Sequence, residues 1–214
     1  MTNVVIRSAV LEDARFLAWA ILTASRGHLP RGWFDIALNQ PESACLEFLK
    51  YLTTTTARSW WHYSRFLIAE AEARPVSTLC ACRAAEAYTV STAAIIETME
   101  TIQMAPAEQA LIWERGSYLF NCTTRPDDDC WIIENIATLP DCRCRGYTAA
   151  LLAQAVEKGR AQGLREAQIT FIIGNESGER AYAAAGFRFA QERRHPAFEA
   201  AAGAPGLRRF VRAL

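Results

Sequence analysis

The chain has 214 residues, of which 51% are hydrophobic and 21% charged, values that are ordinary for one globular domain. Its 23 Lys and Arg residues balance 23 Asp and Glu residues, so no overall basic field is available to attract nucleic acid or an anionic membrane. No apolar run approaches the roughly 20 residues that cross a bilayer, and the N-terminus lacks the features of a secretion signal. We therefore expect one cytoplasmic domain over residues 1–214 that binds neither nucleic acid nor membranes.

In the first half of the chain, apolar spacing predicts a strand, an amphipathic helix, a looser segment broken by Gly and Pro, a second helix and a β-hairpin. In chain order, these elements are expected at residues 3–6, 11–25, 26–40, 42–52, and 66–71 with 76–82. Residues 85–121 lack strand-like alternation and predict two helical pieces broken at Pro106. We therefore expect this stretch to be a helical insertion, at about residues 85–122.

The second half of the chain alternates strands and helices. A polar turn is expected at 125–129, strands at 131–138, 168–173, 187–190 and 207–211, and helices at 146–163 and 177–185. This order predicts an α/β or α+β domain with a mixed sheet. The last stretch, Leu207 to Leu214, offers an apolar strand edge, which favours a homodimer formed through the C-terminal strands.

Seven cysteines are present, and Cys80/Cys82 and Cys142/Cys144 are each spaced C-x-C. Neither pair has the C-x-x-C plus His spacing of a zinc site. We therefore expect reduced thiols that pack as small hydrophobic side chains, and no metal site.

A basic turn joins the strand at 131–138 to the helix that follows it. Arg143, Arg145 and Gly146 precede the first helical turn, whose backbone amides have no partner inside the helix. Such a turn either binds a phosphate group or is a plain connection with two solvated arginines. Because no Walker motif and no G-x-G-x-x-G is present, the ligand would be a phosphorylated compound outside the usual triphosphate and dinucleotide classes.

These residues resemble a known family. Arg143-x-x-Gly146-x-Thr148, followed by an Ala-Leu-Leu run, is similar to the R/Q-x-x-G-x-G/A pyrophosphate motif of the GNAT superfamily of CoA-dependent N-acyltransferases. Thr148 departs from the motif, and its side chain would either crowd a phosphate or donate a hydroxyl hydrogen bond to it.

A second motif follows in the order expected of the family. Asn175, Tyr182 and Gly186-Phe187 resemble the downstream N-x(6)-Y-x(3)-G-F segment, and residues 6–14 resemble the first strand and helix. The resemblance implies the GNAT acyl-CoA N-acyltransferase fold, a mixed, mostly antiparallel sheet flanked by helices, with the insertion between strands 3 and 4.

The resemblance also implies acetyl-CoA as co-substrate. The positions expected to contact it are Ile136, Ala137, Thr138, Arg143, Cys144, Arg145, Gly146, Tyr147, Thr148, Ala149, Asn175 and Tyr182. Main-chain N–H groups of 136–138 would polarise the acyl carbonyl. Asn175 would contact the pantetheine or simply cap the following helix.

Two residues are candidates for catalysis. Glu134 lies among isoleucines, where a carboxylate is costly to bury and its pKa is raised, which suits a general base. The alternative is a Glu paired with an arginine on a neighbouring strand. Tyr182 resembles the family's proton donor to the leaving CoA sulfur, or else is an aromatic packed on the sheet. His62 is a second candidate base.

The acetyl acceptor is less clearly specified. We expect the insertion to line the acceptor cleft, with acids and aromatics either recognising a cationic amine or packing as core. The residues concerned are Trp60, Trp61, Tyr63, Tyr88, Glu97, Glu100, Trp113, Glu114 and Tyr118.

The expected function is an N-acetyltransferase that moves an acetyl group directly from acetyl-CoA to a primary amine of a small molecule. A protein lysine or N-terminus is an alternative acceptor. A non-catalytic acyl-CoA sensor or interaction protein is the alternative function.

Overall fold

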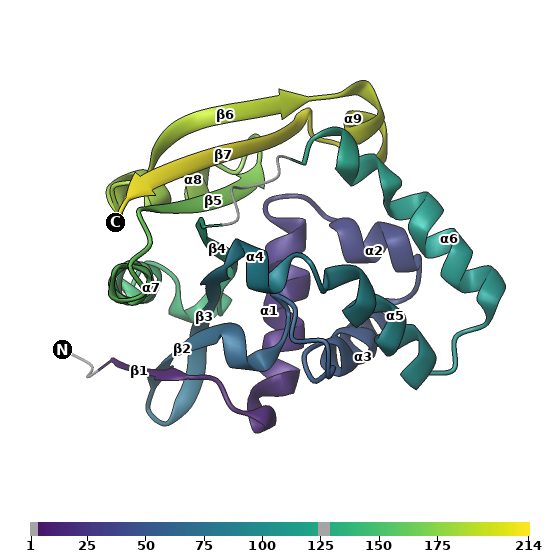
Figure 1. Ribbon diagram of the computed structural model, residues 1–214, viewed down its shortest axis with the longest axis horizontal. Helices are drawn as coiled ribbons and strands as arrows, with labels where there is room; N and C mark the ends of the chain where they lie inside the picture. The colour runs from purple at the N-terminus through teal and green to yellow at the C-terminus, as the bar shows by residue number, and fades with distance from the viewer. Residues whose placement is uncertain (1–3, 124–128) are drawn as a thin grey trace.

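The structure is a computed structural model that describes residues 4–123 and 129–214 (Figure 1). Within these ranges the strands form one seven-stranded sheet in the order β1-β2-β3-β4-β5-β7-β6. The strands are β1 Val5–Ser8, β2 Phe66–Ala71, β3 Arg74–Arg83, β4 Trp131–Thr138, β5 Glu166–Ile172, β6 Arg188–Arg194 and β7 Gly206–Ala213. Among the described strands, only β4 and β5 pair in parallel, which confirms the mixed, mostly antiparallel sheet.

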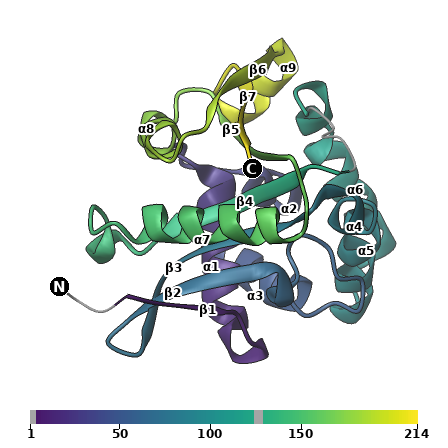
Figure 2. The ribbon, with the colours of Figure 1, turned by 60° about the vertical axis from the view of Figure 1, so that its left-hand side comes forward.

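Helices cover both faces of the β1–β4 half of the sheet (Figures 1 and 2). The α-helices are α1 Ala14–Arg26, α2 Trp33–Leu38, α3 Glu42–Leu52, α4 Ala84–Ala87, α5 Ser91–Thr101, α6 Pro106–Gly116, α7 Tyr147–Ala161, α8 Glu176–Ala184 and α9 Pro196–Ala202. The 3-10 helices are η1 Leu11–Asp13, η2 Tyr63–Arg65, η3 Ser117–Asn121 and η4 Pro140–Cys142. No helix of the described segments is both long and apolar enough to cross a membrane.

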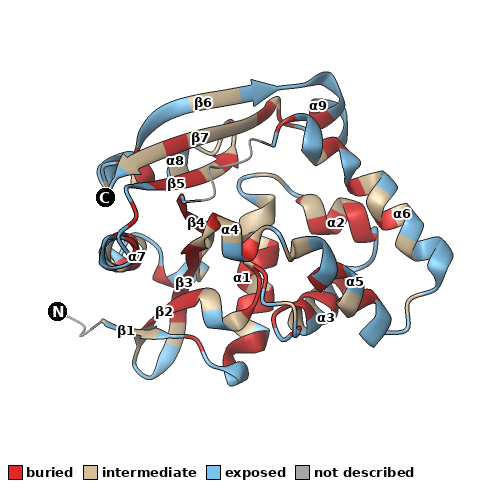
Figure 3. Ribbon diagram, in the orientation of Figure 1, coloured by how far each residue is buried: buried red, intermediate tan, exposed pale blue. Residues whose placement is uncertain are grey.

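Alternating residues of β2, β3 and β4 enter two separate cores. Ile68, Cys80 and Ile132 pack with α1 and α3 on one face. Leu67 and Ile133 pack with α7 on the other. Because both faces are buried, these strands are apolar along most of their length, which is why their sequence predicts them well. Figure 3 shows burial along β2 to β4 and exposure along β6 and much of α6.

Most predicted elements are confirmed, with shifted ends. The strands at 66–71 and 131–138 have the predicted bounds, whereas β1 begins at Val5 and residue 3 lies outside the described residues. Two short helices, α2 and α9, were not predicted. The polar turn at 125–129 lies outside the described residues except for Asp129.

The helical insertion lies between β3 and β4, as expected. It contains α4, α5, α6 and η3 rather than two helical pieces. Pro106 is the first residue of α6, a position where its missing N–H costs no helical hydrogen bond. The prediction that Pro106 breaks the stretch is therefore refined: it starts a helix that packs on α2, with the Trp33 indole donating to the Gly116 carbonyl at 3.0 Å.

The predicted apolar edge at 207–214 is wrong. β7 pairs with β5 on one side and β6 on the other, so it is an inner strand. The outer strand at this end is β6, whose sequence Arg-Phe-Ala-Gln-Glu-Arg-Arg is rich in charge. Charged side chains discourage pairing between sheet edges, so the sheet offers no apolar strand edge here for a dimer.

Candidate active site

The site is built on the divergence of β4 and β5. These parallel strands pair only at Trp131 with Ala167 and Ile132 with Gln168, after which β4 continues without β5 beside it. Residues 133–138 line a cavity of about 1180 Å³, together with residues from β5, α7, α8 and the insertion. Among the described strands, one edge of β4 thus has no partner beyond Ile132, and the hydrogen bonds expected from residues 136–138 to a ligand stay a prediction.

A β-bulge interrupts β4 where it leaves β5. Thr78 pairs with Ala137 and Cys80 with Glu134, so that Asn135 and Ile136 together oppose Leu79. Asn135 has φ of 53°, in the left-handed region that asparagine tolerates better than most residues. The bulge locally re-aims the strand, and the consecutive side chains of Glu134, Asn135 and Ile136 all line the cavity.

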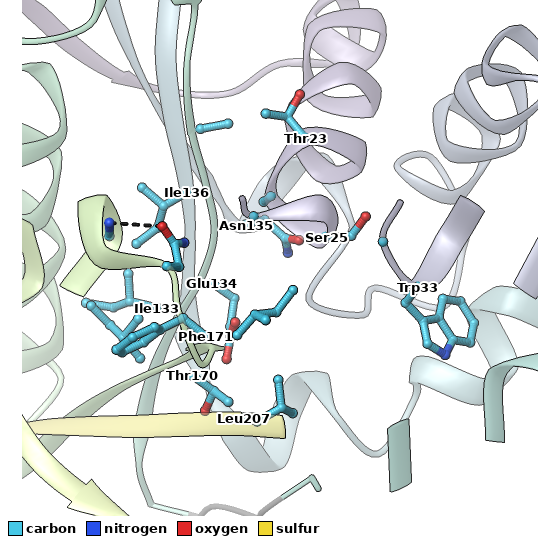
Figure 4. A pocket seen from close by; sticks show the side chains of 18 of the residues that line it. Thr23, Ser25, Trp33, Ile133, Glu134, Asn135, Ile136, Thr170, Phe171 and Leu207 are labelled. Carbon is cyan, nitrogen blue, oxygen red and sulfur yellow. Dashed lines mark hydrogen bonds between the residues drawn. The ribbon is translucent and has the colours of Figure 1, made fainter. Parts of the chain in front are cut away.

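Glu134 lies deep in this cavity, beside Thr170 and Phe171 of β5 (Figure 4). The Tyr88 hydroxyl donates to its Oε1 at 3.3 Å. Burial raises the pKa of Glu134 to about 8, although the hydrogen bonds with Tyr88 and the backbone of Thr170 oppose part of that rise. The side chain keeps some exposed surface toward the cavity, so a proton can reach it.

The alternative for Glu134, pairing with an arginine on a neighbouring strand, is wrong. No described arginine or lysine lies within ion-pair distance of its carboxylate. Its partner is Tyr88, which follows α4 and is 46 positions away in the sequence. In the sequence Tyr88 stands out only as an aromatic residue of the insertion, and no local signal connects it with Glu134.

Tyr182 and Asn175 lie on the other side of the cavity, on and just before α8. Tyr182 is buried, packs edge-on against Phe171, and has its pKa raised by burial and by the nearby Glu134. No described residue accepts a hydrogen bond from its hydroxyl. Asn175 caps α8 by accepting a hydrogen bond from the Gly178 amide at 3.1 Å, as one expectation held. It also lines the cavity, where a contact with the pantetheine stays a prediction.

The turn between β4 and α7 fits a pyrophosphate. Cys144 and Gly146 have φ of 60° and 84°, both in the left-handed region. Within the described residues, no group accepts a hydrogen bond from the backbone amides of residues 144–149. Arg143 and Arg145 are exposed beside them, and no described acid pairs with either. Free amides, a helix N-terminus and two guanidinium groups lie together here, and groups of these kinds are the ones that can hold an anion.

The Thr148 hydroxyl has a hydrogen-bond partner within the protein. Its Oγ1 lies 3.0 Å from Thr138 Oγ1, which lies 2.7 Å from Ser77 Oγ. The Ser77 hydroxyl in turn donates to the Ala137 carbonyl at 3.1 Å. Thr148 therefore faces β4 and ties the start of α7 to the end of β4, so its hydroxyl is engaged within the protein.

Aromatic residues of the insertion line the cavity, but its acids do not. Tyr88, Trp113 and Tyr118 are among the lining residues, with Trp60 and Trp61 from the preceding loop.

The expectation that acids of the insertion recognise a cationic amine there is wrong. Glu97 accepts hydrogen bonds from the amides of Thr56 and Ala57, while Glu100 and Glu114 are exposed and do not line the described cavity. Helical spacing alone did not specify which face of each helix turns toward the cavity.

His62 is not one of the described residues that line the cavity. It caps η2, with Nδ1 2.8 Å from Ser64 Oγ, and its ring contacts Tyr63. Burial, aided by the charges of Arg58 and Arg65, lowers the pKa of His62 to about 4. The structure therefore gives His62 a structural position, and of the two bases that the sequence suggested only Glu134 lines the described cavity.

Comparison with known proteins decides the family. Residues 33–187 match the sequence model of the Acetyltransferase (GNAT) family. The chain belongs to the GNAT acetyltransferase family. It is therefore an acyltransferase of a family that uses acetyl-CoA. No curated protein sequence is significantly similar to this GNAT chain.

Solved structures share the GNAT fold at low sequence identity. An N-acetyltransferase from Staphylococcus aureus Mu50 aligns with a TM-score of 0.71 and 18% identity over 97% of this chain and 100% of the other. The Drosophila melanogaster polyamine N-acetyltransferase, which forms N-acetylagmatine, aligns with a TM-score of 0.55 and 16% identity over 99% and 100%. N-acetylglutamate synthase from Neisseria gonorrhoeae, complexed with coenzyme A, aligns at 0.51 and 18% over 100% of this chain and 36% of the other. These matches support the fold.

Gly146 provides a direct test of the anion site. We expect Gly146→Ala to weaken CoA binding about tenfold, because a side chain at a positive φ strains the turn that directs the amides. Gly163→Ala is the matched control: its φ is 72°, and in both glycines an added Cβ meets no atom within 4 Å. Both variants should lose about 1 kcal/mol of unfolding free energy, whereas only Gly146→Ala should raise the CoA Kd measured by calorimetry.

Proposed function

We propose that this GNAT enzyme transfers the acetyl group of acetyl-CoA directly to a primary amine of a small molecule, with Glu134 as general base and Tyr182 as general acid. The observation that carries the proposal is that one cavity holds Glu134, Tyr182 and the free amides of residues 144–149. A base, a hydroxyl proton donor and an anion site in one cavity are the groups that acyl transfer from a thioester requires.

Each residue has a defined task in this reaction. Acetyl-CoA supplies the thioester, and its pyrophosphate is held by the amides of 144–149 with Arg143 and Arg145. Glu134 accepts a proton from the attacking amine, and a pKa of about 8 suits that transfer near neutral pH. Main-chain N–H groups of residues 136–138 stabilise the negative charge that develops on the carbonyl oxygen. Tyr182, protonated at any working pH, donates its proton to the departing CoA thiolate.

Thiol release tests the proposal. The purified protein is incubated with acetyl-CoA and a panel of small primary amines, and free CoA thiol is followed over time. Amine-dependent release, with the acetylated amine found by mass spectrometry, is the expected result. CoA binding without turnover of any amine would support a sensor instead. Turnover only with peptides that carry lysine or a free N-terminus would show that the acceptor is a protein.

Tyr88 is expected to tune the base rather than to react. Its hydrogen bond lowers the pKa of Glu134, so Tyr88→Phe should raise that pKa further. The rise of kcat/KM with pH should then move upward by about 0.5 to 1 pH unit, since one pKa unit corresponds to about 1.4 kcal/mol and a hydrogen bond to a similar energy. Tyr63→Phe, outside the described cavity lining, is the control. An unchanged profile in Tyr88→Phe would remove Tyr88 from this role.

A further inference from the structure

The wall of the cavity on the side away from residues 143–149 is a connected series of aromatic rings. Trp33 contacts Phe34 at a ring-centroid distance of 5.0 Å, and Phe34 contacts Trp61 at 5.7 Å. Trp61 contacts Trp60 at 4.8 Å, and Trp60 contacts Tyr88 at 5.0 Å. All five side chains line the cavity. Because the Tyr88 hydroxyl donates to Glu134, this aromatic wall, defined by these five residues, leads to the candidate base.

The charge of the cavity is also distinctive. Glu134 is the one acidic residue among the described residues that line it. Asp35, two positions after Trp33, forms an ion pair with Arg26, with an Nη2 to Oδ1 distance of 2.6 Å. It is not among the described residues that line the cavity. Arg31 does line it, and its guanidinium donates to the Asp35 main-chain carbonyl at 2.9 Å. Among the described lining residues, a ligand group bound along the aromatic wall therefore finds no carboxylate besides Glu134, whereas the cations are Arg31 and, in the turn before α7, Arg143 and Arg145.

These features select against a second positive charge on the acceptor. A buried ammonium or guanidinium needs a charged partner, and a contact with aromatic faces alone offsets only part of its lost hydration. The positive charge of Arg31 adds repulsion. An aromatic or alkyl body instead buries apolar surface against rings that are already packed, and such burial is favourable without any counter-ion.

We infer that the acetyl acceptor of this enzyme is a monoamine with an aromatic or large apolar body. The inference rests on the proposed amine acetylation, and it separates this chain from a polyamine or agmatine acetyltransferase. The amine end lies toward Glu134 and the apolar body lies along the aromatic wall.

A pair of amines of equal chain length tests the inference. 4-Phenylbutylamine and agmatine both carry a primary amine on four carbons, but one ends in a phenyl ring and the other in a guanidinium group. The expected kcat/KM is at least tenfold higher for 4-phenylbutylamine. Equal or better use of agmatine would overturn the inference while leaving acetylation itself established.

Binding provides a readout that does not depend on turnover. Titration of intrinsic tryptophan fluorescence with each amine, in the presence of CoA, reports binding beside the tryptophans of the described cavity lining, which are Trp33, Trp60, Trp61 and Trp113. 4-Phenylbutylamine should change the fluorescence at a concentration at least tenfold lower than agmatine does. If neither amine is acetylated but this order holds, the proposed function fails and the pocket selectivity stands. The reverse order overturns the inference.

A charge placed in the cavity lining should change the selectivity. Thr92 is exposed, lines the cavity and lies in the first turn of α5, where a carboxylate is compatible with the helix. Thr92→Glu should shift the kcat/KM ratio toward agmatine by up to about fivefold, as expected of a partly exposed ion pair. Thr92→Gln, of similar size but neutral, should leave the ratio within twofold of wild type. A ratio that is the same in the Glu and Gln variants would contradict the position assigned to the apolar body.

Discussion

Replacement of Glu134 by Gln is expected to lower kcat about 100-fold, a typical contribution of a general base. The amide keeps the size of the side chain and a hydrogen-bond acceptor for Tyr88, but it cannot take a proton from the amine. In the wild type, kcat/KM should rise as pH increases through about 8, because only the deprotonated carboxylate acts as a base. In Glu134→Gln this rise should be absent.

The control separates catalysis from general effects of removing a carboxylate. Glu100 is exposed and outside the described cavity lining, so Glu100→Gln should keep both kcat and the pH profile. The CoA Kd of Glu134→Gln should stay within twofold of wild type, since the anion site lies at residues 143–149. A variant that keeps both its kcat and the rise through pH 8 would exclude Glu134 as the base.

The same carboxyl links folding stability to pH. Burial raises its pKa from 4.5 to about 8, so between these values the folded chain retains a proton that the unfolded chain has lost. Below pH 4.5 the carboxyl is protonated in both states, so the raised pKa costs no stability there. As pH rises from 4.5 to 8 the free energy of unfolding falls, by about 1.4 kcal/mol for each pKa unit between the folded and unfolded values. Urea unfolding should show that Glu134→Gln gains stability relative to wild type across this window, the cost a functional carboxylate imposes on the fold.

Local sequence signals predicted the elements that carry their own pattern. β4 has its predicted bounds because it starts with the apolar run Trp131 to Ile133 and ends shortly before Pro140. The missed helix α2 has only six residues, too few for a periodic pattern. Asp35 stabilises its start by accepting from the Gly32 amide at 2.8 Å, and Trp33 docks it on Gly116, which is 83 residues away. Tertiary packing, rather than propensity, holds this helix.

The candidate site divides in the same way. The turn at residues 143–149 was predictable because its two arginines, its glycine and the start of α7 follow one another in the sequence. The partner of Glu134 was not predictable, because Tyr88 is 46 positions away and the fold of the insertion brings it to Glu134. The acids of the insertion were placed wrongly for a related reason: Glu97 turns toward the backbone of residues 56 and 57, and such an orientation depends on how α5 packs against α3.

Replacement of Tyr182 by Phe is expected to lower kcat by about 10- to 100-fold, the contribution of a general acid. The change removes one oxygen and keeps the ring, whose edge-on contact with Phe171 at a centroid distance of 5.3 Å remains available. Burial and the charge of Glu134 raise the pKa of Tyr182, so the hydroxyl keeps its proton throughout the working pH range. With no described acceptor for that proton, the hydroxyl is available to the CoA sulfur.

The division of the effect between kcat and binding identifies the role. If Tyr182 protonates the leaving thiolate, Tyr182→Phe should slow thiol release while the CoA Kd and the KM for acetyl-CoA stay within about twofold of wild type. If Tyr182 only packs against the bound cofactor, the loss should appear in Kd and KM instead. Tyr118→Phe is the matched control, because Tyr118 is also buried, lines the same cavity and has its pKa raised, to about 12, but lies in the insertion. A change in the KM for the amine, with kcat retained, is the expected result for Tyr118→Phe, since a hydroxyl on the acceptor side cannot serve the leaving thiolate.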